Sequence, residues 1–479
     1  MIDFATSESL DASRVLADAL QSAGDPRGEL LALELASHAS SSWEEARRLN
    51  RRAQQLREAE AGRVWPTGLP EQPAGAKVKM RAGFIVEVSF PWRMDLGTLA
   101  PTPDARAIRS LKGARLLELP STLRPTHLIP LIDPDAPKEP SSERLAPLLA
   151  ELRSLAWFDY VDARLEALLA ARPPLEQLQL RRPPAQSLEG FMAFPLQDVA
   201  LARCVRPDLE QLRRLSQLRS LSIRKLGDSS PRAEAATFEA LAALDGLERL
   251  AVDEGGTAPS WRTLVPRLPR LRELSLLRGA MMGDHSSWSR AHRSLAALES
   301  LESLGAQDRF VDARLLEQLP RLRRLQLWTS DDQQGRRRRT PLPSLEHLAV
   351  SFPLLDTLGE CPSPSLAVGS PTASFLDGPS PWPRVANLSK RVPLRALEFE
   401  RIRPGPIPAE LVPRLSSLES LALTWLPQTP DAVAMLARLP RLHRLRVEQE
   451  LTTAEHRALA RALPSVRLET TRWWPGSGS

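Results

Sequence analysis

A spacing of leucines, Leu-x-x-Leu-x-(Leu/Val/Ile/Phe), recurs along most of this chain and limits what it can fold into. Clear copies are Leu175/Leu178/Leu180, Leu218/Leu221/Ile223, Leu247/Leu250/Val252, Leu271/Leu274/Leu276, Leu322/Leu325/Leu327, Leu345/Leu348/Val350, Leu394/Leu397/Phe399, Leu418/Leu421/Leu423 and Leu442/Leu445/Val447. Weaker copies are Ala114/Leu117/Leu119, Leu152/Leu155/Trp157, Leu196/Val199/Leu201, Leu298/Leu301 and Leu463/Val466/Leu468. Most successive copies lie 21 (175 to 196) to 29 (218 to 247) residues apart, with longer steps only from 114 to 152 and from 345 to 394, and this period indicates an array of structural repeats.

Each copy predicts a short strand followed by a helix. In the Leu-x-Leu part, alternate side chains point to opposite faces, so the two apolar ones enter a core while their neighbours face away. The helix after Thr429 has proline at its first position and ends before Pro440, as proline requires. A single repeat cannot bury its own apolar face, but stacked repeats can, so we expect parallel strands joined by helices.

Residues 80–470 therefore resemble a leucine-rich-repeat solenoid. The resemblance implies an α/β fold with parallel strands on the concave face and short helices on the convex face. The family's asparagine ladder is absent, because the corresponding positions are occupied by Leu226, Gly279, Ser330, Pro353 and Leu426. We therefore expect an irregular coil.

Residues 1–62 predict a small all-α domain. Val15, Leu16, Ala19 and Leu20 form an apolar stripe on a first helix. Three capping signals then follow. Gly24 suits the left-handed position after a helix, Asp25 an N-cap, and Ser42 to Glu45 a capping box that opens a third helix.

The N-terminal block resembles the bacterial repeat-companion domain, a module that precedes leucine-rich repeats. The matching stretches are Leu16–Leu20, Gly24–Leu30, Trp65–Pro70, Arg81–Phe84 and Val86–Val88. The resemblance implies an architecture and no particular activity.

Segments rich in proline, glycine and serine mark the boundaries of the array. We expect a linker at 63–79, a strand or hairpin at 78–90 that covers the open end of the solenoid, and a flexible tail at 471–479. Irregular insertions are expected near 133–142, 331–341 and 353–391, the last with one degenerate repeat near Leu366/Val368 and otherwise a flexible bulge.

The sequence carries no recognisable catalytic chemistry. Zinc-binding His-Glu-x-x-His, phosphate-binding glycine loops and Gly-x-Ser-x-Gly elbows are all missing. His285 and His292 lack a known ligand spacing, and Cys204 and Cys361 lie far apart. We expect no enzyme activity, no cofactor and no metal; an activity hidden in the N-terminal helices is the remote alternative. No signal peptide or membrane span is visible, which favours the cytoplasm.

The predicted function is protein binding on the concave face. Strand residues that flank the leucines project there, namely Gln177, Gln179, Arg181, Ser220, Ser222, Arg224, Glu273, Ser275, Arg324, Gln326, Trp328, His347, Glu398, Glu400, Arg444 and Arg446. Tryptophan and arginine dominate binding hot spots, so the candidate site is Arg324, Gln326, Trp328 and His347, with Arg444 and Arg446. Trp328 could equally pack under the neighbouring arginine loop.

The alternative is binding of nucleic acid or another polyanion through arginines. Basic residues outnumber acidic ones by 64 to 58, and Arg336–Arg339 form a run of four. Because acids and bases are interleaved instead of segregated on one stretch, this alternative ranks second.

Overall fold

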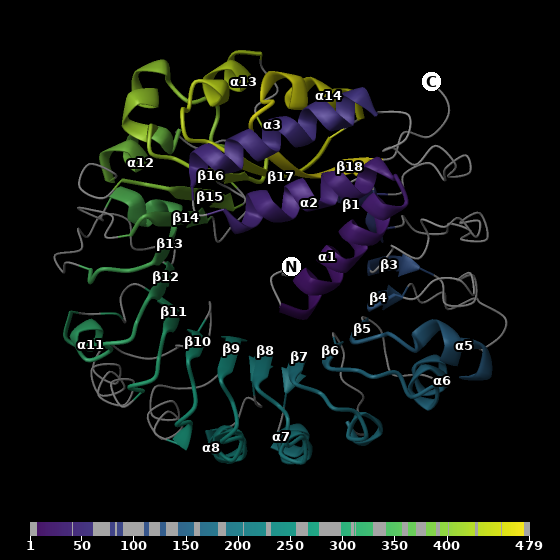
Figure 1. Ribbon diagram of the computed structural model, residues 1–479. Helices are drawn as coiled ribbons and strands as arrows, with labels where there is room; N and C mark the ends of the chain where they lie inside the picture. Colours follow the sequence, from purple (N-terminus) through teal and green to yellow (C-terminus); the bar gives the residue numbers. More distant parts are fainter. Residues whose placement is uncertain are drawn as a thin grey trace. The chain divides into compact units, whose positions relative to one another are not determined.

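The computed structural model shows helices and strands along most of the chain (Figure 1). It describes residues 7–40, 42–60, 77–81, 84–89, 110–114, 125–130, 142–157, 163–180, 188–204, 206–226, 231–254, 267–276, 298–307, 311, 313–328, 342–356, 363–369, 380–388, 393–400, 402–426, 430–451 and 453–473.

The chain divides into two compact units. Unit 1 comprises Met1–Ala114, Glu118–Leu123 and Thr372–Ser479, and unit 2 comprises Arg115–Leu117 and Arg124–Pro371. Unit 1 thus combines the two ends of the sequence, and unit 2 holds its middle.

Unit 2 is a series of parallel strands with helices between them. The strands are β4 (His127–Pro130), β5 (Ser154–Trp157), β6 (Gln177–Leu180), β7 (Asp198–Cys204), β8 (Ser220–Leu226), β9 (Arg249–Glu254), β10 (Glu273–Leu276), β11 (Ser303–Gln307), β12 (Arg324–Trp328), β13 (His347–Ser351) and β14 (Ser365–Gly369). The helices are α5 (Ser142–Leu149), α6 (Ala163–Ala170), η4 (Glu189–Phe191), α7 (Arg206–Leu212), α8 (Pro231–Ala242), α11 (Ala313–Glu317) and η8 (Phe352–Asp356).

The leucine pattern sets the register of these strands. From β9 to β12, one core leucine of each strand pairs with that of the next strand, in the order Leu250, Leu274, Leu304 and Leu325. Each of these leucines is at most 2% exposed. Burial of one such side chain contributes about 1.5–3 kcal/mol. The middle of the chain is therefore a leucine-rich-repeat solenoid, as the spacing predicts.

Unit 1 continues the repeat pattern and adds an antiparallel hairpin. Its strands are β15 (Ala396–Glu400), β16 (Ser420–Leu423), β17 (Arg444–Leu451) and β18 (Arg467–Trp473), all parallel, with β1 (Lys77–Arg81), β2 (Phe84–Ser89) and β3 (Ser110–Ala114). The β1–β2 hairpin lies between β18 and β3, because β1 pairs antiparallel with β18 and β2 pairs parallel with β3. The predicted hairpin thus pairs with the last repeat strand of the chain. Helices α12 (Trp382–Leu388), η10 (Ala409–Leu415), α13 (Pro430–Ala437) and α14 (Thr453–Ala462) complete the repeats.

The N-terminal part of unit 1 is a three-helix module made of α1 (Ser7–Ser22), α2 (Pro26–Ala39) and α3 (Trp43–Ala59). The predicted caps at Gly24, with φ +70°, and at Asp25 are confirmed, and the Ser42 side chain accepts the Glu45 N–H as a capping box requires. The other half of the box is replaced, because the Ser42 N–H donates to the Ser40 hydroxyl instead of to Glu45. Gly28 allows α1 and α2 to meet, since a Cβ there would lie 2.5 Å from the Gln21 nitrogen.

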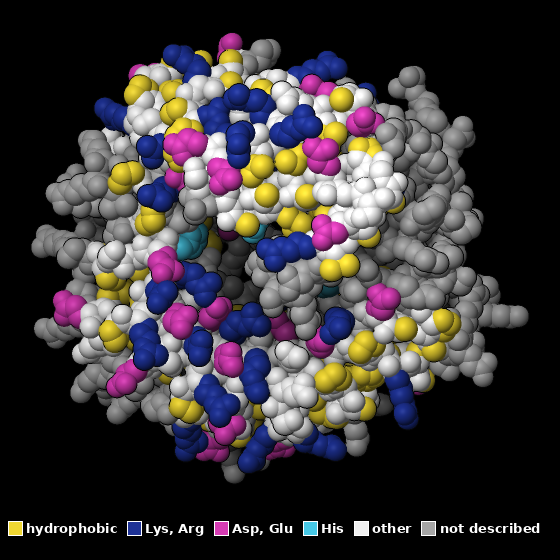
Figure 2. All heavy atoms as spheres, in the orientation of Figure 1, with side chains coloured by type: hydrophobic (Ala, Val, Ile, Leu, Met, Phe, Trp, Pro, Cys, Tyr) yellow, Lys and Arg dark blue, Asp and Glu magenta, His cyan; other side chains and the backbone are white. Residues whose placement is uncertain are grey.

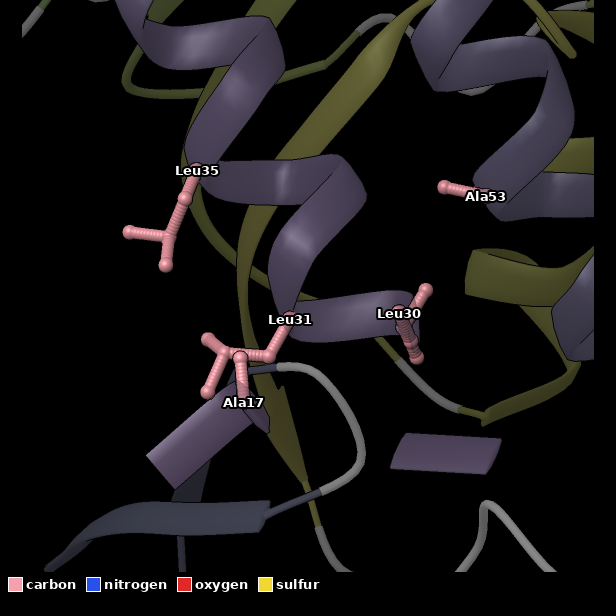
Figure 3. Packing of buried hydrophobic residues seen from close by; sticks show 5 residues of the cluster. All are labelled: Ala17, Leu30, Leu31, Leu35 and Ala53. Atoms are coloured by element: carbon pink, nitrogen blue, oxygen red, sulfur yellow. The ribbon is translucent and has the colours of Figure 1, made fainter. Parts of the chain in front are cut away.

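The predicted stripe on α1 is wrong in part. Val15 is 68% exposed and Ala19 is also exposed, whereas Ala17 is buried against α2. Figure 3 shows Leu31 lying against Ala17 within the module core, which also contains Leu30, Leu35 and Ala53. The helix is rotated from the expected orientation because the close approach at Gly28 brings the Ala17 side of α1 onto α2.

Two weak copies of the repeat are corrected. The copy predicted at Leu298/Leu301 lies three residues later, because Leu304 pairs with Leu274. The last copy is shifted by two residues, because Leu468 pairs with Leu445. In both repeats the last apolar position holds a smaller or polar residue, Ala306 or Thr470, which hides the pattern.

Several predicted boundaries also differ. The linker 63–79 overlaps β1, which begins at Lys77, and the tail 471–479 overlaps β18, which ends at Trp473. The insertion 353–391 contains β14, confirming the degenerate repeat, and also most of η8 and all of α12, so its described parts are regular structure instead of a flexible bulge. Of the copy predicted at 114–119, only Ala114 is described, as the last residue of β3.

Candidate functional site

The side chains between the buried leucines form two rows across the strands of unit 2. The second row lies between the two core positions of each strand. It is uncharged throughout and, apart from two glutamines, small: Ala156, Gln179, Ala200, Ser222, Ala251, Ser275, Gly305, Gln326, Ala349 and Ala367. The first row, at the start of each strand, carries the charges: His127, Ser154, Gln177, Asp198, Ser220, Arg249, Glu273, Ser303, Arg324 and His347.

Arginines in the first row reach across one strand to a carboxylate. Arg324 on β12 lies 2.5 Å from Glu273 on β10, above Ser303 of the intervening strand. Arg249 and Asp198 repeat the arrangement at 3.8 Å across Ser220. Ser303 and Ser220, the short residues between acid and arginine, leave room for the arginine side chain to cross the intervening strand. Each arginine of the first row is thereby paired with a carboxylate of the same row.

Four of the six predicted site residues lie together on β12 and β13 of unit 2. Arg324, Gln326 and Trp328 alternate along β12, and His347 pairs with Arg324 in the register. The Gln326 amide lies over Gly305, where a Cβ would come within 3.3 Å of its oxygen. Trp328 is partly exposed, but its indole N–H is buried and has no hydrogen-bond partner among the described residues. These four residues are called the β12–β13 patch below.

His347 is held as a neutral ring. Burial, and then the nearby Arg324 guanidinium, lower the pKa of His347 from its ordinary value. Its Nδ1 lies 2.8 Å from the Ser365 hydroxyl on β14. The Ser365 hydroxyl therefore orients the ring within the patch.

The other two predicted residues, Arg444 and Arg446, belong to unit 1. Arg444 donates to Glu469 at 3.0 Å, and Arg446 pairs with Glu398 across Ala422. The pairing across Ala422 repeats the acid, small residue and arginine order of unit 2. The six residues thus form two separate sets, one in each unit.

Sequence reasoning missed a third charged row, which lies one residue before each strand of unit 2. From β8 to β13 arginine and glutamate alternate there: Arg219, Glu248, Arg272, Glu302, Arg323 and Glu346. These six residues are called the ladder edge below. Their side chains are 37% to 65% exposed and pair at 3.7, 3.8 and 3.0 Å. Figure 2 shows basic and acidic side chains intermixed over the part of the surface occupied by β7 to β12. Comparison of one fixed position across successive repeats would have found this row.

In unit 1 the corresponding strand edge is covered by α3. The Asn50 amide donates to the His443 carbonyl at 2.9 Å, next to β17, and reaches the Ser465 carbonyl at 3.5 Å, next to β18. Ser37 on α2 donates to the Asn50 oxygen at 2.8 Å, and the Arg441 guanidinium stacks 5.5 Å from the centre of the Trp43 ring. The helical module therefore docks through a buried polar network.

The described residues offer little for catalysis. Among them, no three His, Cys, Asp or Glu side chains come together as metal ligands. Burial raises the pKa of the Cys204 thiol, which opposes a nucleophilic role. Arg181, His285, His292, Arg336–Arg339 and Cys361 lie outside the described residues. None of the described helices is long and apolar enough to cross a bilayer.

Comparisons with known proteins show only distant likeness. The chain resembles the solved complex of Rad7 and Elc1 in yeast at 17% identity, with a TM-score of 0.36, over 59% of this chain and 77% of that one. It resembles the TLR13–ssRNA13 complex at 15% identity, with a TM-score of 0.31, over 74% of this chain and 62% of that one. Likeness this low bears on no question of function. No protein-family model and no curated protein sequence matches the chain.

Proposed function

We propose that this chain is a non-catalytic scaffold that binds a partner protein on the concave face of unit 2, at the β12–β13 patch. The observation that carries the proposal is the combination at this patch of a partly exposed tryptophan, an arginine and a neutral histidine on two adjacent strands. Large aromatic and arginine side chains supply most of the free energy in protein interfaces.

The pairing of arginines disfavours the polyanion alternative. Arg324, Arg444 and Arg446 all contact carboxylates. A phosphate would have to displace those carboxylates, and the neutralised rows supply no excess positive charge to attract it. Retention on heparin at physiological salt would support the polyanion alternative instead.

The N-terminal helices are proposed to be a repeat-companion module of the bacterial type, acting in the cytoplasm. The confirmed turn at Gly24 and Asp25 supports the resemblance, since it is the most specific of the matching stretches. Contacts of α3 with β17 and β18 support a role in covering the repeats.

Affinity capture from the native cell tests the proposed site. Full-length protein is compared with the Trp328→Ala/Arg324→Ala variant and with Gln179→Ala, a control on the same face of β6. We expect one protein partner to be lost from the double variant and kept by the control. Capture of the same proteins by all three would refute the patch.

A further inference from the structure

Within unit 1, the contact of α3 with the residues that precede β17 and β18 shows how these repeats bind a helix at a strand edge. Ala46, Asn50 and Ala53 are the buried residues of α3, and they share one face of the helix. The two alanines allow a close approach, and the amide supplies the hydrogen bonds to backbone carbonyls. Arg51 adds a contact with the Ser465 hydroxyl at 3.4 Å.

Asn50 binds where the backbone hydrogen bonds between two adjacent repeats lack one N–H donor. The carbonyl before a strand usually accepts two N–H groups from the next repeat, as the Glu419 carbonyl does from His443 and Arg444. Among the backbone donors of the described residues, the His443 carbonyl accepts only the Arg467 N–H, because the Val466 N–H donates back to the Leu463 carbonyl. The Asn50 amide takes the place of the missing donor.

Unit 2 has the same gap at the end of the ladder edge. The Arg323 carbonyl accepts two N–H groups, from Glu346 and His347. At the next step Pro364 has no N–H, and the Ser365 N–H bonds to the Ser363 hydroxyl. No donor among the described residues reaches the Glu346 carbonyl.

The charges beside this gap suit a helix that lies across the strand ends. Adjacent strands are about 4.8 Å apart, and one helical turn rises about 5.4 Å, so a helix meets roughly one strand per turn. Arg272, Glu302, Arg323 and Glu346 alternate in sign along that direction. On a partner helix, side chains at i and i+4 lie on the same face, one turn apart. If acidic and basic residues alternate at that spacing, each can face a ladder-edge residue of opposite charge.

We propose that the ladder edge of unit 2 binds an α-helix of a partner protein, which presents a carboxamide to the Glu346 carbonyl between alternating acidic and basic side chains. The ladder edge adjoins the β12–β13 patch but shares no residue with it, and the variants of each leave the residues of the other unchanged, so each of the two proposals can fail alone.

The probe is a hydrocarbon-stapled peptide of 17 residues, the length of α3, which keeps the Ala-x3-Asn-x2-Ala face and alternates Glu and Arg along both borders. The control peptide has alanine in place of the asparagine. Fluorescence anisotropy measures the binding of each peptide to the full-length protein. Loss of one buried hydrogen bond should weaken binding of the control peptide about tenfold.

Two matched protein variants locate the binding. Arg323→Gln/Glu346→Gln neutralises one pair of the ladder edge, and Arg395→Gln/Glu419→Gln neutralises the corresponding pair of unit 1. We expect the first to weaken binding of the probe severalfold and the second to leave it unchanged. Equal affinity for both peptides, no binding, or sensitivity only to the unit 1 variant would each overturn the proposal.

Discussion

The strand edges of the two units are built alike but are covered differently. In unit 1, α3 lies on the edge of β17 and β18, and the Asn50 amide donates to the His443 carbonyl there. In unit 2, the corresponding edge carries exposed, alternating arginine and glutamate side chains. The difference shows that one repeat frame can either bind a helix from its own chain or present the same edge to the surroundings.

The largest expected effect, on stability, comes from loosening the three-helix module of unit 1. Leu30 is fully buried between the helices, and Leu30→Ala should cost about 2–5 kcal/mol by leaving a cavity. Hydrogen exchange followed by mass spectrometry should then show faster exchange in α2 and α3. The segments of unit 2, from β5 to β13, should exchange as before. Equally faster exchange in both units would contradict the difference between the two edges.

A smaller effect on stability is expected from removing the hydrogen bond between α3 and the His443 carbonyl. Asn50→Ala removes the donor to His443 and the nearer of the two acceptors of the Ser37 hydroxyl on α3, at a cost of about 1–3 kcal/mol. Chemical denaturation of the variant should show this loss, with Gln54→Ala, a partly exposed position on the same helix, as the control. An Asn50→Ala variant as stable as the Gln54→Ala control would mean that the polar network does not hold α3.

The smallest expected effect concerns pH in unit 2. Burial and Arg324 lower the pKa of His347, so the unfolded chain, with a histidine pKa of about 6.5, binds a proton more readily than the folded chain. His347 therefore makes stability fall as the pH drops below about 6.5, and has no such effect above it.

Chemical denaturation at about pH 7.5 and about pH 5 should show a smaller pH-dependent loss in His347→Gln than in the unchanged protein. The same pH dependence in both proteins would assign it to other groups.

The fold could be predicted because its cause is local. Leucines that recur at a fixed spacing decide which side chains are buried, and Leu274 and Leu325 lie in the core as the pattern requires. The pattern failed where a repeat lost its last apolar residue, as at Ala306 and Thr470. There the register follows from the neighbouring strands alone.

The candidate site could be predicted only in part, because its partners are distant in sequence. Arg324 meets Glu273 over 51 residues, and Asn50 meets the His443 carbonyl over 393 residues. Strand alternation places a side chain on a face but does not identify the group beside it. The prediction therefore placed Arg324, Arg446 and the carboxylates Glu273 and Glu398 on one face, but missed the ion pairs that they form.

Carboxyl labelling with carbodiimide and mass spectrometry tests most directly the claim that one edge is open and the other covered. The side chains of Glu346 and Glu302 are 65% and 37% exposed, whereas those of Glu419 and Glu34 in unit 1 are 23% and 8% exposed. The predicted result is fast labelling of Glu346 and Glu302, slower labelling of Glu419, and the slowest labelling of Glu34. Protection of Glu346 and Glu302 to the level of Glu34 would contradict the account.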